Sequence, residues 1–150
     1  MIWKQKATVL AIVSLIIAAT LNAAPQIEGK YKAKLFWVPI GGAARGNVTG
    51  KGSVTAFLAG KRLSLTGTFE GLSSPATVAR LHRGVAKGAR GPVISDLAIT
   101  GAERGTINGS LELTSDQLDD LRQGRLYIQL HSEKGVSPDG SNLWGWLLPQ

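Results

Sequence analysis

The stretch LELTSDQLDDLRQGRLYIQLH, residues 111–131, combines two alternating segments with a short helical one between them. Leu111 and Leu113 alternate with polar residues, and a period of two is typical of a half-buried strand. The alternation returns at the end of the stretch, where the apolar positions are Leu126, Ile128 and Leu130. Since side chains of a strand point alternately to its two faces, we expect these apolar side chains to lie in the core.

The segment between the two strands has the start and the end of a helix. Thr114 followed by Gln117 fits a capping box, in which two side chains satisfy free backbone groups at a helix start. Aspartates are favoured there by the positive end of the helix dipole, and the stretch supplies Asp116, Asp119 and Asp120. Gly124 is typical of a helix end. The sequence therefore predicts one short helix over 115–123.

The rest of the chain is dominated by the same alternation of apolar and polar residues. It predicts strands over 31–37, 53–58, 63–69, 77–82, 93–100 and 143–148, and another that begins at 107. Residues rich in Gly and Pro separate these segments. Many short strands with such turns predict an all-β protein, either an antiparallel sandwich or a barrel.

The first residues have the layout of a secretory signal peptide. Lys4 and Lys6 precede an apolar run over 7–21, and small residues follow it. The run is about 15 residues long, short of the roughly 20 that a membrane span needs. We therefore expect residues 1–24 to be a signal peptide and 25–150 to be one domain in the periplasm or outside the cell. An uncleaved anchor, the only expected membrane attachment, is the alternative.

Composition narrows the classes of function. The chain has no cysteine, which excludes disulfides, thiolate metal sites and thiol nucleophiles. Removal of residues 1–24 would lower the formal charge from +7 to +5, because Lys4 and Lys6 leave and no acidic residue does. A positive charge either serves solubility or attracts acidic partners, such as anionic envelope polymers or membrane surfaces. An envelope polymer or a protein is the partner that we expect. The basic residues are scattered, so we do not expect nucleic-acid binding.

Two longer runs resemble a known family. They are LSLTGTFEGLSSPATVARLHRGVAKGARGPVI at 63–94 and LELTSDQLDDLRQGRLYIQLHSEKGVSPDGSNLWGWL at 111–147. Together they resemble the CHRD domain, named for chordin and widespread in bacterial exported proteins, over residues 53–148. The resemblance implies an extracytoplasmic β-sandwich of Greek-key type, similar in outline to copper/zinc superoxide dismutase. The resemblance carries no general biochemical activity with it; in chordin the domains belong to a protein that binds a growth factor.

The chain departs from the family pattern at two places. Where family members usually carry a His-x-His pair, this chain has Arg80-Leu81-His82. Where they often carry an acid-x-Arg-Gly strand, it has Asn142-Leu143-Trp144-Gly145. Both departures argue against transferring a metal site or a polar cluster from the family.

His82 and His131 are the only histidines, and alternation places both on the polar faces of their strands. If those strands are neighbours, the two side chains predict a copper or zinc site completed by a carboxylate or water. The candidate carboxylates are Glu70, Glu133 and Asp139. The alternative is that the two histidines only hold loops by hydrogen bonds, and the fixed charge of Arg80 beside His82 favours it.

Two further features are candidate binding sites. The Gly-rich loop over 83–91 carries Lys87 and Arg90 and would bind an anion if its backbone amides converge. Otherwise it is a plain connection between strands. Trp144 and Trp146 share one face of the last strand, where they would either bind a sugar or protein partner or belong to the core.

The sequence thus predicts an exported binding or structural module without catalytic activity. It contains no Ser-His-acid set and no paired acids at a recognisable spacing. A copper- or zinc-binding periplasmic protein that uses His82 and His131 is the alternative, and a small envelope enzyme is a third hypothesis. Neither the composition nor the spacing names the partner.

Overall fold

The computed structural model describes residues 28–38, 45–46, 48–134 and 142–150. Its elements are β1 (Gly29–Trp37), β2 (Lys51–Ala59), β3 (Arg62–Glu70), β4 (Ala76–Arg83), β5 (Val93–Ile99), β6 (Gly105–Glu112), α1 (Ser115–Arg122), β7 (Leu126–Ser132), β8 (Leu143–Trp146) and β9 (Leu148–Pro149). The expected signal peptide and Asp139 lie outside the described residues. Among the described residues, no helix has the length and apolar character that crossing a membrane requires.

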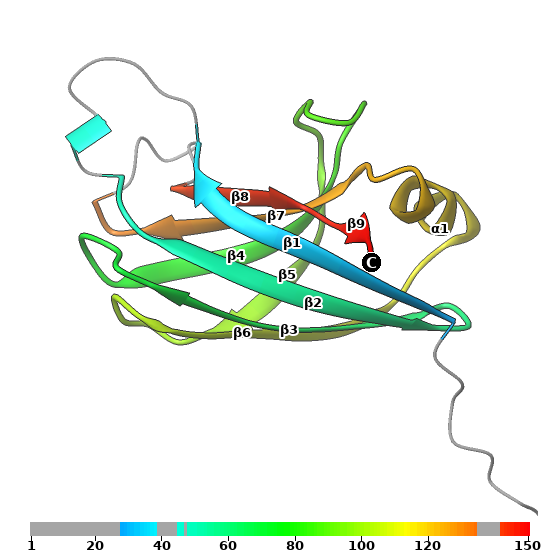
Figure 1. The fold of residues 1–150 in the computed structure, drawn as a ribbon, viewed down its shortest axis with the longest axis horizontal. Helices are drawn as coiled ribbons and strands as arrows, with labels where there is room; N and C mark the ends of the chain where they lie inside the picture. The colour runs from blue at the N-terminus through cyan, green and yellow to red at the C-terminus, as the bar shows by residue number, and fades with distance from the viewer. Residues whose placement is uncertain (1–27, 39–44, 47, 135–141) are drawn as a thin grey trace, which may run out of the picture.

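The strands form an antiparallel barrel and not a two-layer sandwich (Figure 1). Within the described residues the order is β1-β2-β3-β6-β5-β4-β7-β8, and β8 pairs with β1 again to close the circle of eight. The spatial order β3-β6-β5-β4 is a Greek key. An antiparallel all-β fold with one short helix is confirmed, and the sandwich is corrected. Alternation marks the inward side chains in both architectures, so it cannot distinguish them.

Closure uses both edges of β1. One edge pairs with β2 from Gly29 to Leu35, and the other edge pairs with β9 at Tyr31 and Lys32 and with β8 at Phe36 and Trp37. β1 and β8 approach closely beside Gly145, where a Cβ atom would lie 2.4 Å from the carbonyl oxygen of Lys34. A glycine at this position therefore allows β8 to close the barrel.

The apolar positions of the alternating segments fill the barrel. Of the residues expected in the core, Leu113, Leu126, Ile128 and Leu130 are at most 2% exposed, whereas Leu111 is only partly buried against the core. The apolar positions of β3 are at most 3% exposed, namely Leu63, Leu65 and Phe69. They belong to one continuous cluster of buried side chains. Because burial of one such side chain stabilises a fold by about 1.5–3 kcal/mol, this interior is the main source of stability.

Helix α1 lies across one end of the barrel (Figure 1). The capping box is confirmed: Gln117 N donates to Thr114 Oγ1 at 3.2 Å, and Thr114 N donates to Gln117 Oε1 at 2.9 Å. Gly124 follows the helix with a φ of 67°, a value that glycine adopts readily. Leu118 and Leu121 point into the barrel and join its core.

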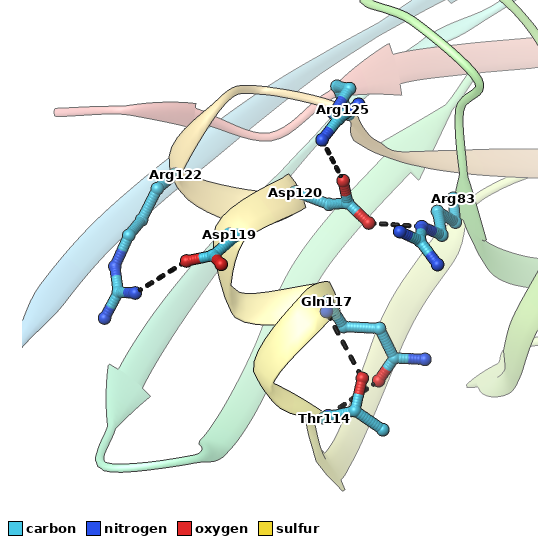
Figure 2. A network of polar contacts seen from close by, with 7 residues as sticks. All are labelled: Arg83, Thr114, Gln117, Asp119, Asp120, Arg122 and Arg125. Atoms are coloured by element: carbon cyan, nitrogen blue, oxygen red, sulfur yellow. Dashed lines mark hydrogen bonds and ion pairs between the residues drawn. The ribbon is translucent and has the colours of Figure 1, made fainter.

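A buried carboxylate attaches α1 to two strands (Figure 2). Asp120 is 1% exposed, and its side chain forms ion pairs with Arg83 at the end of β4 and with Arg125 just before β7. By contrast, Asp119 and Arg122 form an exposed pair at 3.2 Å. From the sequence, Asp120 is expected only to interact with the helix dipole, since nothing in its spacing distinguishes it from its exposed neighbour.

Candidate functional site

The outer face of the sheet formed by β4, β7 and β8 is largely covered, although its side chains point away from the barrel interior. Tyr127 is 1% exposed and Gln129 is 4% exposed. Both lie beside outward-facing rings from neighbouring strands. We call His82, Tyr127, Trp144 and Trp146 the outer aromatic cluster. Burial on this face therefore comes from the rings and from the loop that covers them.

The last strand directs its leucines inward and its tryptophans outward. Leu143 in β8 and Leu147 just after it are fully buried in the barrel, whereas Trp144 and Trp146 are half-buried on its outside. The tryptophans are therefore not part of the barrel core. Their rings have one side against the protein and another side at the surface, which leaves apolar area for a ligand.

The rings of the cluster form a continuous series across three strands. His82 stacks on Tyr127 with 4.9 Å between ring centroids, and Tyr127 lies 4.5 Å from Trp146. Trp144 meets Trp146 edge to face at 6.0 Å. Such ring pairs contribute about 0.5–1.5 kcal/mol each beyond the area they bury. The cluster is therefore a rigid surface that needs little ordering when a ligand binds.

One backbone unit of the Gly-rich loop holds the cluster in place. Gly91 N donates to the Tyr127 hydroxyl at 3.0 Å, and the same hydroxyl donates to Gly91 O at 3.2 Å. His82 Nδ1 lies 3.1 Å from the same oxygen. Because a carbonyl oxygen only accepts hydrogen bonds, Nδ1 of His82 carries the proton. Burial also raises the pKa of the Tyr127 hydroxyl.

His82 is held as a neutral ring. Its burial lowers the pKa of the imidazole below 6.5, and the charges of Arg80 and Arg90 lower it further, while the hydrogen bond to Gly91 opposes them. The second ring nitrogen, Nε2, is buried and has no hydrogen-bond partner among the described residues. This histidine therefore acts as a stacked, uncharged part of the cluster at neutral pH.

The loop between β4 and β5 uses its amides internally. Gly84 N donates to Arg125 O at 2.8 Å, and Ala89 N donates to Ala86 O at 3.0 Å. With Gly91 N bound to Tyr127, these amides do not converge on a common point as an anion cradle requires. Lys87 is exposed on the turn, and the Arg90 guanidinium lies over the Trp144 ring at 5.7 Å. The loop is thus an ordered cover of the cluster.

Arg80 belongs to a second row of side chains across the same face. Its Nε donates to Asp96 Oδ1 at 2.8 Å, so its charge is paired. In register it lies opposite Gln129, which lies opposite Trp144. Gln129 on β7 therefore lies between Arg80 on β4 and Trp144 on β8, so Arg80 is not next to the tryptophans.

The structure does not bring the two histidines together. β4 and β7 are neighbours as the metal hypothesis requires, but His131 pairs with Val78 while His82 pairs with Tyr127. Four residues of strand separate them, which is about 13 Å at 3.3 Å per residue. No group of three potential metal ligands occurs among the described residues. The copper or zinc hypothesis stays a prediction without a shared site in this geometry.

A groove of about 580 Å³ runs along the outer aromatic cluster where β8 meets β1. We call it the lysine–tryptophan groove; it is lined by Lys32, Lys34, Phe36, Trp144, Gly145, Trp146, Leu148 and Gln150. Phe36 is 54% exposed, an unusual exposure for a phenylalanine on a strand. Among the residues that the structure describes, two lysines and no acidic side chain line this groove, so its described lining is both apolar and positively charged.

The comparison with protein families identifies most of the barrel. The family model of the CHRD domain matches residues 38–140. The chain belongs to the CHRD domain family. Comparisons with curated proteins and with solved structures give no match. The suspected resemblance is thus confirmed, with a match that begins earlier and ends earlier than the range suggested by the motifs.

The family match leaves out the two strands that line the groove. Residues 38–140 contain β2 to β7 of this CHRD protein, whereas β1 and β8 lie outside the match. Every residue that lines the lysine–tryptophan groove belongs to β1, β8 or the residues after β8. The family match therefore covers most of the barrel and carries no information on the groove.

Part of this site was predicted from the sequence. Trp144 and Trp146 were predicted, whereas Phe36 and the two lysines beside it, Lys32 and Lys34, were not. Lys32, Lys34 and Phe36 alternate with buried residues of β1, so their common face was readable from the sequence. Their proximity to the tryptophans was not readable, because it depends on the pairing of β1 with β8.

Proposed function

We propose that this CHRD protein is an exported, non-catalytic binding module that holds its partner in the lysine–tryptophan groove. The observation that carries the proposal is the exposure of Phe36 beside two half-buried tryptophans in a groove of ligand-binding size. The signal-peptide pattern of residues 1–24 supports action in the periplasm or outside the cell.

Several properties of the groove fit binding better than structural support. Large exposed apolar side chains next to rigid rings are typical of the residues that dominate binding energy. The rings are held by the contacts of Tyr127 with Gly91, so the surface exists before the partner arrives. Preorganisation of this kind lowers the entropic cost of association.

The experiment measures retention of the protein on washed cell envelopes of the producing organism. The protein is expressed from its full-length gene, purified after export, and compared with Phe36→Ala. Val85→Ala is the matched control, because Val85 is 72% exposed and lines a different hollow. We expect saturable retention that weakens about tenfold in Phe36→Ala and is unchanged in the control. Equal retention of Phe36→Ala and the wild type would refute the groove as the binding site.

A further inference from the structure

We infer that the partner is an acidic polysaccharide, a chain of sugar rings that carry carboxylates. The inference rests on the proposed function and names the chemistry of its ligand. Sugar rings would stack on Trp144, Trp146 and Phe36, and their carboxylates would pair with Lys32 and Lys34. Aromatic faces bind apolar ring surfaces, and ammonium groups bind carboxylates as charge-assisted hydrogen-bond donors.

The groove repeats both kinds of contact at the same spacing. Lys32 and Lys34 are two residues apart on β1, and Trp144 and Trp146 are two residues apart on β8. Positions two apart on one face of a strand lie about 6.6 Å apart. Because β8 and β1 are paired strands, a row of charges runs beside a row of rings. A polymer whose units each have an apolar face and a carboxylate can meet both rows at once.

The hollow surface continues past the groove across the barrel. A second depression of about 320 Å³ shares Lys34 and Phe36 with the first and reaches Lys51 and Glu70. In it, Lys51 Nζ lies 3.3 Å from Glu70 Oε1, so part of its positive charge is balanced. The two depressions together cross from β8 to β3, three strand spacings or roughly 14 Å. That length favours an extended chain over a single small molecule.

Charge and shape favour a polysaccharide over the other acidic partners. An acidic peptide would satisfy Lys32 and Lys34, but it brings no flat ring faces to the tryptophans. An anionic membrane would accommodate Phe36 and Leu148, which are 54% and 37% exposed, but it would not use the faces of Trp144 and Trp146, which are half-buried and packed on Tyr127. The Arg90 guanidinium over Trp144 adds a further positive charge beside the ring.

The test titrates the exported full-length protein with four probes and follows tryptophan fluorescence and heat. The probes are polygalacturonate, dextran as a neutral polysaccharide, poly-glutamate as an acidic peptide, and vesicles that contain phosphatidylglycerol. The variants are Phe36→Ala and Lys34→Glu. Lys61→Glu is the matched control, because Lys61 is exposed in the turn that follows β2, and the last residue of β2 lies about 20 Å along the strand from the partner of Lys34. Circular dichroism checks that each variant is folded.

We expect polygalacturonate to bind with a change in tryptophan fluorescence and with an affinity that falls as salt rises. Lys34→Glu and Phe36→Ala should each weaken it about tenfold, and Lys61→Glu should change it less than twofold. Equal binding of dextran overturns the charge requirement. If poly-glutamate or the vesicles bind as tightly as polygalacturonate, and Phe36→Ala does not weaken that binding, the inferred polysaccharide partner is wrong.

The outcome also separates this inference from the proposed function. If none of the four probes binds while retention on envelopes still depends on Phe36, the groove is a binding site and the polysaccharide is wrong. If retention on envelopes is also independent of Phe36, both the proposed function and the polysaccharide are wrong.

Discussion

Replacement of Asp120 by Asn should destabilise the protein far more than the same replacement at the adjacent Asp119. The Asp120 side chain is 1% exposed and pairs with two arginines, Arg83 and Arg125, whose side chains are 42% and 31% exposed. Asp119 has one exposed partner, Arg122. The two variants therefore remove the same charge from the same helix in opposite environments.

The magnitude follows from burial on the two sides of the ion pair. Loss of one partner of a buried pair costs about 3–5 kcal/mol when the remaining charge stays buried. Here the arginines keep access to water and can be hydrated once Asp120 is neutral. We therefore expect Asp120→Asn to cost about 2–3 kcal/mol, below that range. Asp119→Asn should cost at most about 0.5 kcal/mol, as for exposed pairs on a helix.

Urea denaturation followed by far-ultraviolet circular dichroism measures the difference, and thermal unfolding checks it. A loss of 2–3 kcal/mol should lower the Tm of Asp120→Asn by about 5–10 °C. The difference from Asp119→Asn should persist in 0.5 M NaCl, because salt screens a buried pair weakly. If the two variants unfold within about 0.5 kcal/mol of each other, the carboxylate does not hold α1, and Leu118 and Leu121 alone account for its docking.

Two further predictions concern the hydrogen bonds through which Gly91 holds the outer aromatic cluster. Because the pKa of His82 is lowered in the folded protein, the unfolded chain binds the proton first as pH falls below 6.5; stability is complete above that pH and decreases below it. Urea titrations from pH 8 to 5 should show a smaller loss in His82→Gln than in the wild type, and parallel curves would contradict this. Gly91→Ala places a Cβ 1.9 Å from Arg83 O, whereas the nearest atom at Gly101 is 3.8 Å away, so only the first should lower the free energy of unfolding, by about 1–3 kcal/mol. An unchanged Gly91→Ala would mean that the loop shifts without cost.

The sequence predicted the local structure and the inward faces well, because both depend on short-range patterns. The alternation at Leu63 and Leu65 of β3 settled which side is buried. The capping box at Thr114 and Gln117 settled where α1 begins. In each case the decisive residues lie within a few positions of one another, and their chemistry allows one arrangement.

The same patterns did not predict which outward-facing side chains are covered. Alternation predicted that Tyr127 and Gln129 face away from the core, which is correct, but outward does not mean exposed. Their burial comes from the loop that carries Gly91 and from rings on β8. Contacts of this kind join residues far apart in the sequence, so local spacing does not predict them.

Barrel closure and the groove have one cause, and this explains why the sequence predicted neither. Both arise where the edge of β1 opposite β2 pairs with β8, which places Phe36 across from Trp144. In a sandwich with open edges, Phe36 and Trp144 would belong to separate edge strands, and the lysines of β1 would have no rings beside them. The pairing turns two edges into a lined groove. Since β1 and β8 also lie outside the CHRD match, variation in these two strands would change the lining of the groove and leave β2 to β7 as they are.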